Sequence, residues 1–70
     1  MNIEMLKAQW TDFRGQAKER WGELTNDDLM EVEGEFDQLV AKVQERYGIA
    51  KAEAREEVNE WLSNIRQTTH

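Results

Sequence analysis

A helical pattern of apolar residues occurs twice in this chain, at a constant offset of 26 residues, and it restricts the possible folds more than any other feature. Apolar residues recur every three or four positions in both copies, which places them on one face of an α-helix. The equivalent pairs are Trp10 and Phe36, Phe13 and Leu39, Ala17 and Val43, Trp21 and Tyr47, and finally Gly22 and Gly48. We therefore predict two related helices, each with one buried face and the same ending at glycine.

Helix is the expected state of most of the chain, because proline is absent and only glycines interrupt the pattern. The four glycines are Gly15, Gly22, Gly34 and Gly48. The first apolar stripe continues across Gly15, so the pattern leaves open whether residues 3–21 form one helix or two. We expect Gly22 and Gly48 to take the left-handed conformation that commonly ends a helix.

The strongest local start signal lies at Thr25. Its hydroxyl can accept a hydrogen bond from an amide of the first helical turn, and Asp28 occupies the third position of a capping box. Leu24 and Leu29 have the spacing of a hydrophobic staple. These residues predict a short helix that begins after Thr25 and closes near Gly34.

Two further helices are expected, over residues 35–47 and 50–65. Their predicted inward residues are Phe36, Leu39, Val40, Val43 and Tyr47 in one, and Ala54, Val58, Trp61, Leu62 and Ile65 in the other. Residues 66–70 lack a periodic partner and are expected to fray. Residues 1–70 are thus predicted to form one domain of two helical hairpins, 3–33 and 35–65. The hairpins would pack together as a small all-α bundle of four to five helices.

The length and composition limit the class of protein. Seventy residues allow one domain with a small core, and the absence of cysteine excludes disulfides and thiolate metal sites. No apolar run approaches the roughly 20 residues that span a bilayer, and the N-terminus lacks the pattern of a signal peptide. We therefore expect a cytoplasmic protein.

The charge is acidic and concentrated in the middle of the chain. Fifteen acidic and nine basic side chains give a net charge of -6. Residues 25–48 contain seven acidic side chains, Asp27, Asp28, Glu31, Glu33, Glu35, Asp37 and Glu45, against Lys42 and Arg46. Such a surface repels nucleic-acid and lipid phosphates, so it disfavours those partners and suits basic partners or plain solubility.

No catalytic, cofactor, metal or small-molecule site is predicted. The only histidine is His70, the only serine is Ser63, and cysteine is absent, so no nucleophile can be matched with a base. A calcium loop starting at Asp28 would need an oxygen ligand at its third position and glycine at its sixth, where Met30 and Glu33 stand. The acidic stretch is therefore interpreted as a solvated helical face.

Two other groups of residues have alternative interpretations. The tryptophans Trp10, Trp21 and Trp61 could stack on bases, but each lies in the apolar register of its helix, which favours the core. The basic cluster Arg14, Lys18 and Arg20 could contact phosphate or anionic lipid. Because Glu19 and Glu23 alternate with it, a mixed surface of salt bridges is favoured.

Several of these residues resemble the CsbD-like family. The likeness lies in Trp10, Phe13, Gly15 and Lys18, in the link from Trp21 to Thr25 followed by Asp27 and Asp28, in Gly34 with Asp37-Gln38-Leu39, and in Gln44, Tyr47 and Gly48. The resemblance implies two helical hairpins packed crosswise, with an outline similar to sterile-alpha-motif bundles. It also implies a role in the bacterial stress response, and it supplies no catalytic or ligand-binding residue.

Two hypotheses on function follow. The first is a non-enzymatic stress-response protein that acts as a soluble interaction or protectant protein, through the acidic surface. The alternative is a nucleic-acid- or membrane-surface-associated regulator that uses a helical hairpin.

Overall fold

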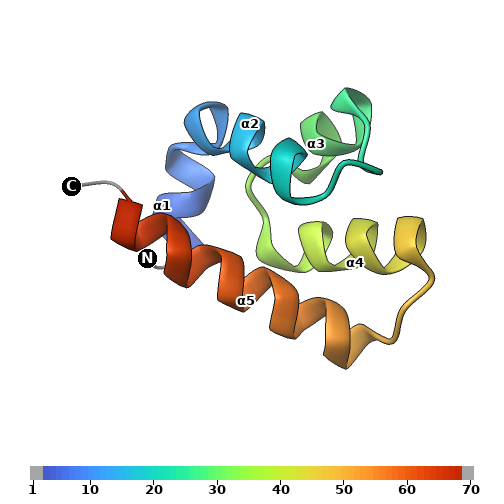
Figure 1. The fold of residues 1–70 in the computed structure, drawn as a ribbon. Helices are drawn as coiled ribbons and strands as arrows, with labels where there is room; N and C mark the ends of the chain where they lie inside the picture. The colour runs from blue at the N-terminus through green and yellow to red at the C-terminus, as the bar shows by residue number, and fades with distance from the viewer. Residues whose placement is uncertain (1–2, 69–70) are drawn as a thin grey trace.

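The computed structural model describes residues 3–68 of the chain, and the side chains of residues 6–64. Every regular element in this part is a helix, and together the helices form a compact bundle (Figure 1). The helices are α1 (Ile3–Ala8), α2 (Trp10–Arg20), α3 (Asn26–Val32), α4 (Phe36–Tyr47) and α5 (Lys51–Thr68). The prediction of a small all-α bundle is confirmed.

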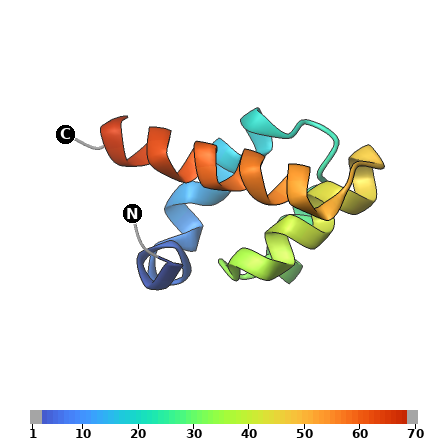
Figure 2. The same cartoon turned by 90° about the horizontal axis from the view of Figure 1, so that it is seen from below.

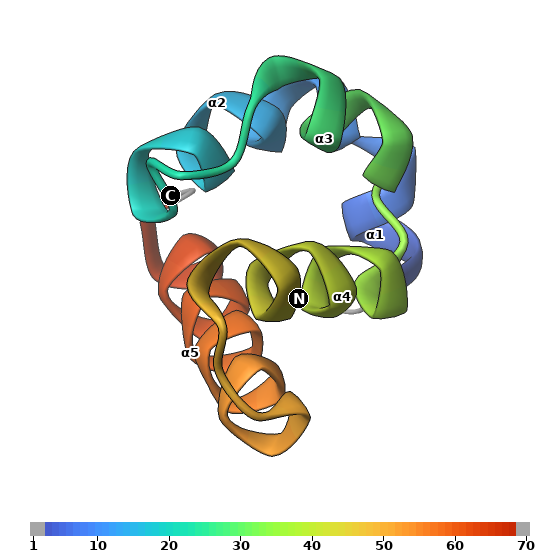
Figure 3. The same ribbon diagram turned by 90° about the vertical axis from the view of Figure 1, so that its right-hand side faces the viewer.

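Helices α4 and α5 run side by side in opposite directions and form a hairpin (Figure 1). Helix α3 packs on α4 and α2, and α5 passes in front of α2 and α4 in the view of Figure 2. Helix α1 lies beside the segment between α3 and α4 (Figure 3). None of the helices described is both long enough and apolar enough to cross a membrane.

The apolar stripes of the helices meet in one core. Its buried residues are Leu6, Trp10, Phe13, Ala17, Trp21, Leu24, Leu29, Val32, Phe36, Leu39, Val40, Val43, Ala54, Val58, Trp61 and Leu62. Burial of apolar area is the main favourable term in folding, so this cluster stabilises the arrangement of all five helices. The predicted inward residue Ile65 lies outside the described side chains.

The two helices of the repeat begin at equivalent residues but end differently. Helices α2 and α4 begin at the equivalent residues Trp10 and Phe36. The prediction of a left-handed Gly22 is wrong, because positive φ angles among glycines occur at Gly34 and Gly48. Helix α2 ends instead at Trp21, whose backbone leaves the helix at φ -124° and ψ 83°.

The different endings explain why the two aromatic residues are not equivalent. Trp21 is buried, whereas Tyr47 is 40% exposed, so the prediction that Tyr47 faces the core is wrong. Tyr47 remains the last residue of the regular helix α4, and Gly48 then ends that helix at φ 64°.

The first stripe is divided into two helices, but the break lies at Gln9 rather than at Gly15. Gln9 has φ -116° and ψ 27°, outside helical geometry, and Gly15 lies inside the continuous helix α2. A Cβ added at position 15 would meet no atom of another part of the protein within 4 Å. Gly15 therefore neither breaks the helix nor serves close packing.

The remaining boundaries follow the predictions closely. Helix α3 starts after Thr25 with both bonds of the predicted capping box, and it ends at Glu33, which has φ 50°. Helix α5 continues to Thr68, so the predicted end at residue 65 is too early and residues 66–68 are helical. Residues 69–70 of the predicted frayed end lie outside the described part.

Candidate functional site

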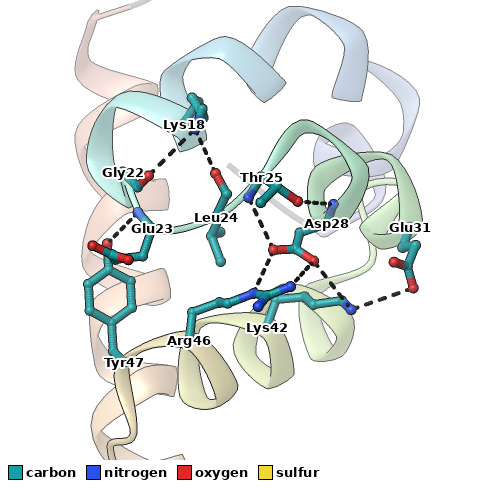
Figure 4. A network of polar contacts seen from close by, with 10 residues as sticks. All are labelled: Lys18, Gly22, Glu23, Leu24, Thr25, Asp28, Glu31, Lys42, Arg46 and Tyr47. Carbon is teal, nitrogen blue, oxygen red and sulfur yellow. Dashed lines mark hydrogen bonds and ion pairs between the residues drawn. The ribbon is translucent and has the colours of Figure 1, made fainter.

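The most tightly bonded polar group in the described part of the chain is the carboxylate of Asp28 (Figure 4). The Thr25 amide donates a hydrogen bond to its Oδ2 at 3.1 Å, and the Asp28 amide donates to Thr25 Oγ1 at 3.0 Å. Arg46 approaches from α4 with two donors, Nε at 2.8 Å from Oδ2 and Nη2 at 2.9 Å from Oδ1. Asp28 thus both caps α3 and joins it to α4.

These contacts determine the charge of Asp28. The paired Arg46 guanidinium, and then the Thr25 amide, hold the pKa of this carboxyl far below its usual range. The same carboxylate raises the pKa of Arg46. Lys42 Nζ adds a second positive group, 3.7 Å from Asp28 Oδ1. Asp28 therefore stays ionised near neutral pH and is unsuited to general acid or base catalysis, which needs a pKa near the working pH.

The link between α2 and α3 is held by side chains from two helices (Figure 4). Lys18 Nζ donates to the carbonyl oxygens of Leu24 at 2.8 Å and Gly22 at 3.5 Å. From α4, the hydroxyl of Tyr47 accepts a hydrogen bond from the Glu23 amide at 3.1 Å. The exposed position of Tyr47 thus has a structural role, since it satisfies a loop amide.

The tryptophans are core residues, so the prediction of core packing is confirmed. All three are less than one-tenth exposed. Trp10 Nε1 donates to the Leu29 carbonyl at 2.8 Å, and Trp21 Nε1 donates to Glu57 at 3.1 Å. The rings of Trp21 and Trp61 meet edge to face, with centroids 5.2 Å apart. Base stacking on these rings would require the core to open, so that alternative is wrong.

The basic cluster of α2 is divided among different partners. Lys18 binds the link, as described above, and Arg20 lies 3.4 Å from Glu57 of α5. Among the described residues, no ion pair joins either of them to Glu19 or Glu23, which the sequence had suggested as partners. Arg14 lines an open hollow between α2 and α3 with Asn26 and Met30, whose side chain is 59% exposed.

The acidic middle of the chain is more neutralised than its composition suggests. Asp28 is buried against two cations, Glu31 lies 3.5 Å from Lys42, and Glu35 lies 2.9 Å from Lys7. Asp37 and Arg55 approach to 4.0 Å. Within the described residues, no group of three or more acidic, histidine or cysteine side chains could hold a metal ion. The acidic side chains of residues 25–48 therefore do not form one continuous free surface.

Sequence reasoning found Asp28 as a capping residue but missed its pairing with Arg46. The two residues are 18 positions apart, and only the packing of α3 on α4 brings them together. The role of Lys18 was accessible to sequence reasoning, because lysine near a helix end often bonds the last carbonyl groups. The role of Tyr47 was hidden by the assumption that it repeats Trp21.

Comparison with known proteins identifies the family that the chain matches. The family model described as CsbD-like matches residues 4–56. The chain is 51% identical over 61 residues to UPF0337 protein ECA0631 of Pectobacterium atrosepticum, covering 87% of this chain and 88% of that protein. It is 49% identical over 61 residues to UPF0337 protein YjbJ of Escherichia coli K12, with the same coverage. It is 46% identical over 65 residues to UPF0337 protein PA4738 of Pseudomonas aeruginosa, covering 93% of this chain and 100% of that protein.

Proposed function

Because this chain belongs to the CsbD-like family, a general stress-response family, we propose that it acts in the bacterial cytoplasm as a non-enzymatic stress-response protein that binds basic proteins. The binding surface in this proposal is the acidic stripe, which we define as Glu53, Glu56 and Glu60 of α5. One observation carries the proposal. Most of the described basic side chains have partners within the protein, whereas the acidic stripe is exposed and in no ion pair among the described residues.

Most described basic side chains have internal partners. The engaged residues are Lys7, Lys18, Arg20, Lys42, Arg46 and Arg55. A cation held against a carboxylate or a carbonyl group contributes less to the outward potential than a free one, because its field is partly cancelled nearby. The carboxylates in these pairs are cancelled to the same degree, so the net charge remains -6 and the local surface potential depends mainly on the side chains that have no partner.

The acidic stripe has the opposite character. Its members are three and four positions apart in α5, so they lie along one side of the helix. All three are exposed, and none takes part in an ion pair within the described residues. Glu57, beside them, is used by Arg20 and by the indole of Trp21. Charge complementarity makes a lysine- or arginine-rich protein the best match for this stripe.

The alternative of a nucleic-acid- or membrane-surface regulator has weaker support. Its phosphate contacts would depend on Arg14, Lys18 and Arg20, and the last two are already bonded within the protein. Phosphate binding gains its free energy mainly from free Lys and Arg side chains. Catalysis also has little support, since the buried carboxylate of Asp28 is locked in its ionised form by Arg46.

A binding measurement with a defined basic probe tests the proposal. Fluorescence anisotropy of a labelled ten-residue lysine peptide is followed at low salt for the wild type and for the triple variant Glu53→Gln, Glu56→Gln, Glu60→Gln. We expect the variant to bind at least about tenfold more weakly, since each lost carboxylate charge removes part of the attraction to the lysines. Added salt should weaken wild-type binding.

The matched control removes the same number of charges elsewhere. The variant Glu19→Gln, Glu23→Gln, Glu45→Gln changes exposed glutamates of α2, the link and α4 and gives the same net charge. It should retain most of the affinity. If both triple variants lose affinity equally, binding follows net charge alone, and the acidic stripe is not a site.

A further inference from the structure

The open hollow between α2 and α3 combines a positive charge with an exposed apolar side chain. Arg14 of α2 lines it together with Asn26 and Met30 of α3, and its volume is about 290 Å³. The two helices lie next to each other at the top of the molecule in Figure 1. Pockets that hold small molecules enclose most of the ligand surface, which an open hollow of this size does not do. It has room instead for one or two side chains of a partner.

Arg14 is a half-buried cation that forms no hydrogen bond or ion pair with the other described residues. The residues three and four positions away in α2 carry no carboxylate; they are Trp10, Thr11, Ala17 and Lys18. An ion pair along the helix is therefore not available to it. A guanidinium group presents its N–H donors in a planar fork that matches the two oxygens of a carboxylate. Arg14 thus offers charged donors to a group from outside the described part of the chain.

Met30 places an apolar contact in the same hollow. Its side chain is 59% exposed, and it is one of two large apolar side chains exposed in the described part, the other being Tyr47. Single exposed apolar side chains are common, so the informative point is that Met30 and Arg14 line one hollow. Methionine and arginine are both enriched in protein interfaces, and the flexible thioether adapts to the shape of a partner.

The charges around the hollow restrict the kind of anion that fits it. Asp12 and Asp27 are exposed and lie close in sequence to Arg14 and Asn26, and the whole chain carries a net charge of -6. These charges repel a doubly charged phosphate more than a singly charged carboxylate. One guanidinium can balance one carboxylate, and contact with Met30 calls for an apolar group beside that carboxylate.

We propose that the hollow binds a segment of another protein in which an aspartate or glutamate stands next to a large apolar residue. Arg14 donates two hydrogen bonds to the carboxylate, Met30 contacts the apolar side chain, and the amide of Asn26 bonds a peptide group of the segment. The hollow shares no residue with the acidic stripe of α5, so this inference does not depend on the proposed function.

A titration followed by nuclear magnetic resonance tests the proposal. The probe is the peptide acetyl-Gly-Leu-Asp-Leu-Gly-amide, in which the aspartate carries the only charge. We expect it to shift the side-chain amide of Asn26 and the backbone amides around Arg14. The same peptide with asparagine in place of aspartate should bind about tenfold more weakly, because hydrogen bonds to a charged group are the stronger ones. Equal binding of the two peptides, or binding of neither, would overturn the proposal.

Two variants with one matched control locate the site. Arg14→Gln should bind the aspartate peptide about tenfold more weakly. Lys51→Gln removes the same charge from an exposed lysine of α5 that has no ion pair among the described residues, and it should keep the affinity. Equal loss in these two variants would mean that binding follows net charge, which contradicts the assigned hollow.

Met30→Gln keeps the length of an exposed side chain and removes its apolar character. It should also weaken binding, and unchanged affinity would contradict the role of Met30. Circular dichroism checks the fold of every variant. Should Arg14→Gln unfold, the comparison of the two peptides and the effect of Met30→Gln decide.

Two further titrations identify other occupants of the hollow. If butyrate shifts the same amides with the same affinity as the peptide, the hollow is a site for small carboxylates, and a protein segment as occupant is overturned. If these amides shift on concentration of the protein alone, the hollow receives a carboxylate of a second copy, and a different protein is overturned. We expect neither result, since the peptide offers both the charge and the adjacent apolar groups.

Discussion

The carboxylate of Asp28 bonds to two elements at once, and it is the only buried charged side chain in the described part of the chain. Its contacts with Thr25 fix the start of α3, and its two hydrogen bonds with Arg46 fix the position of α3 on α4. A buried charge is tolerated only when it is paired and hydrogen-bonded, and Asp28 meets both conditions. The residue therefore specifies how the two helices meet.

The pH dependence of stability should report this carboxylate. The pKa of Asp28 is lower in the folded protein than in the unfolded chain, where it is about 4, so its stabilising contribution is complete above about pH 4. The contribution is lost as the pH falls from there towards the lower folded pKa. We expect the variant Asp28→Asn to be about 2 kcal/mol less stable than the wild type at pH 7.

Urea unfolding at several pH values measures the effect. The difference between wild type and Asp28→Asn should shrink steadily between about pH 4 and pH 2, because the carboxyl of Asp28 takes up a proton there in the unfolded chain while it stays ionised in the folded protein. A difference that stays constant over this range would show that the ion pair with Arg46 does not contribute as described.

At the scale of the elements, the repeat shows what a sequence pattern can and cannot specify. The shared spacing predicted most of the buried residues of α2 and α4, because one buried face needs only local periodicity. The endings differ because Trp21 packs edge to face on Trp61 of α5, whereas Tyr47 reaches back to the link. Both contacts join distant parts of the chain, and the pattern within one helix does not contain them.

Substitution of the two equivalent aromatic residues should therefore give unequal effects. Trp21→Ala removes a buried indole and should cost about 3 to 5 kcal/mol, enough to unfold most of a domain with so small a core. Tyr47→Ala removes a half-exposed ring and one hydrogen bond and should cost about 1 to 2 kcal/mol. Thermal unfolding, monitored by circular dichroism, measures the loss of stability in each variant. Equal losses would restore the equivalence that the repeat suggested.

At the scale of the whole molecule, the fold class was accessible from the sequence and the distribution of charge was not. Glycine and capping signals around Thr25 and Gly48 marked helix ends, and helical periodicity marked the core. The division of the basic residues among internal partners depends on tertiary contacts such as Arg20 with Glu57. The break at Gln9 also lacked a signal, because glutamine is neither a breaker nor a preferred cap.

The central claim is that most of the described basic side chains have partners within the protein while the acidic stripe of α5 is exposed. Nuclear magnetic relaxation of backbone amide protons by cationic and anionic nitroxides measures the local surface potential directly. We predict that the cationic probe relaxes amides near Glu53, Glu56 and Glu60 more strongly than the anionic probe, and that amides near Arg46 show no preference for the anionic probe. Equal relaxation of residues 53–60 by both probes would contradict the account.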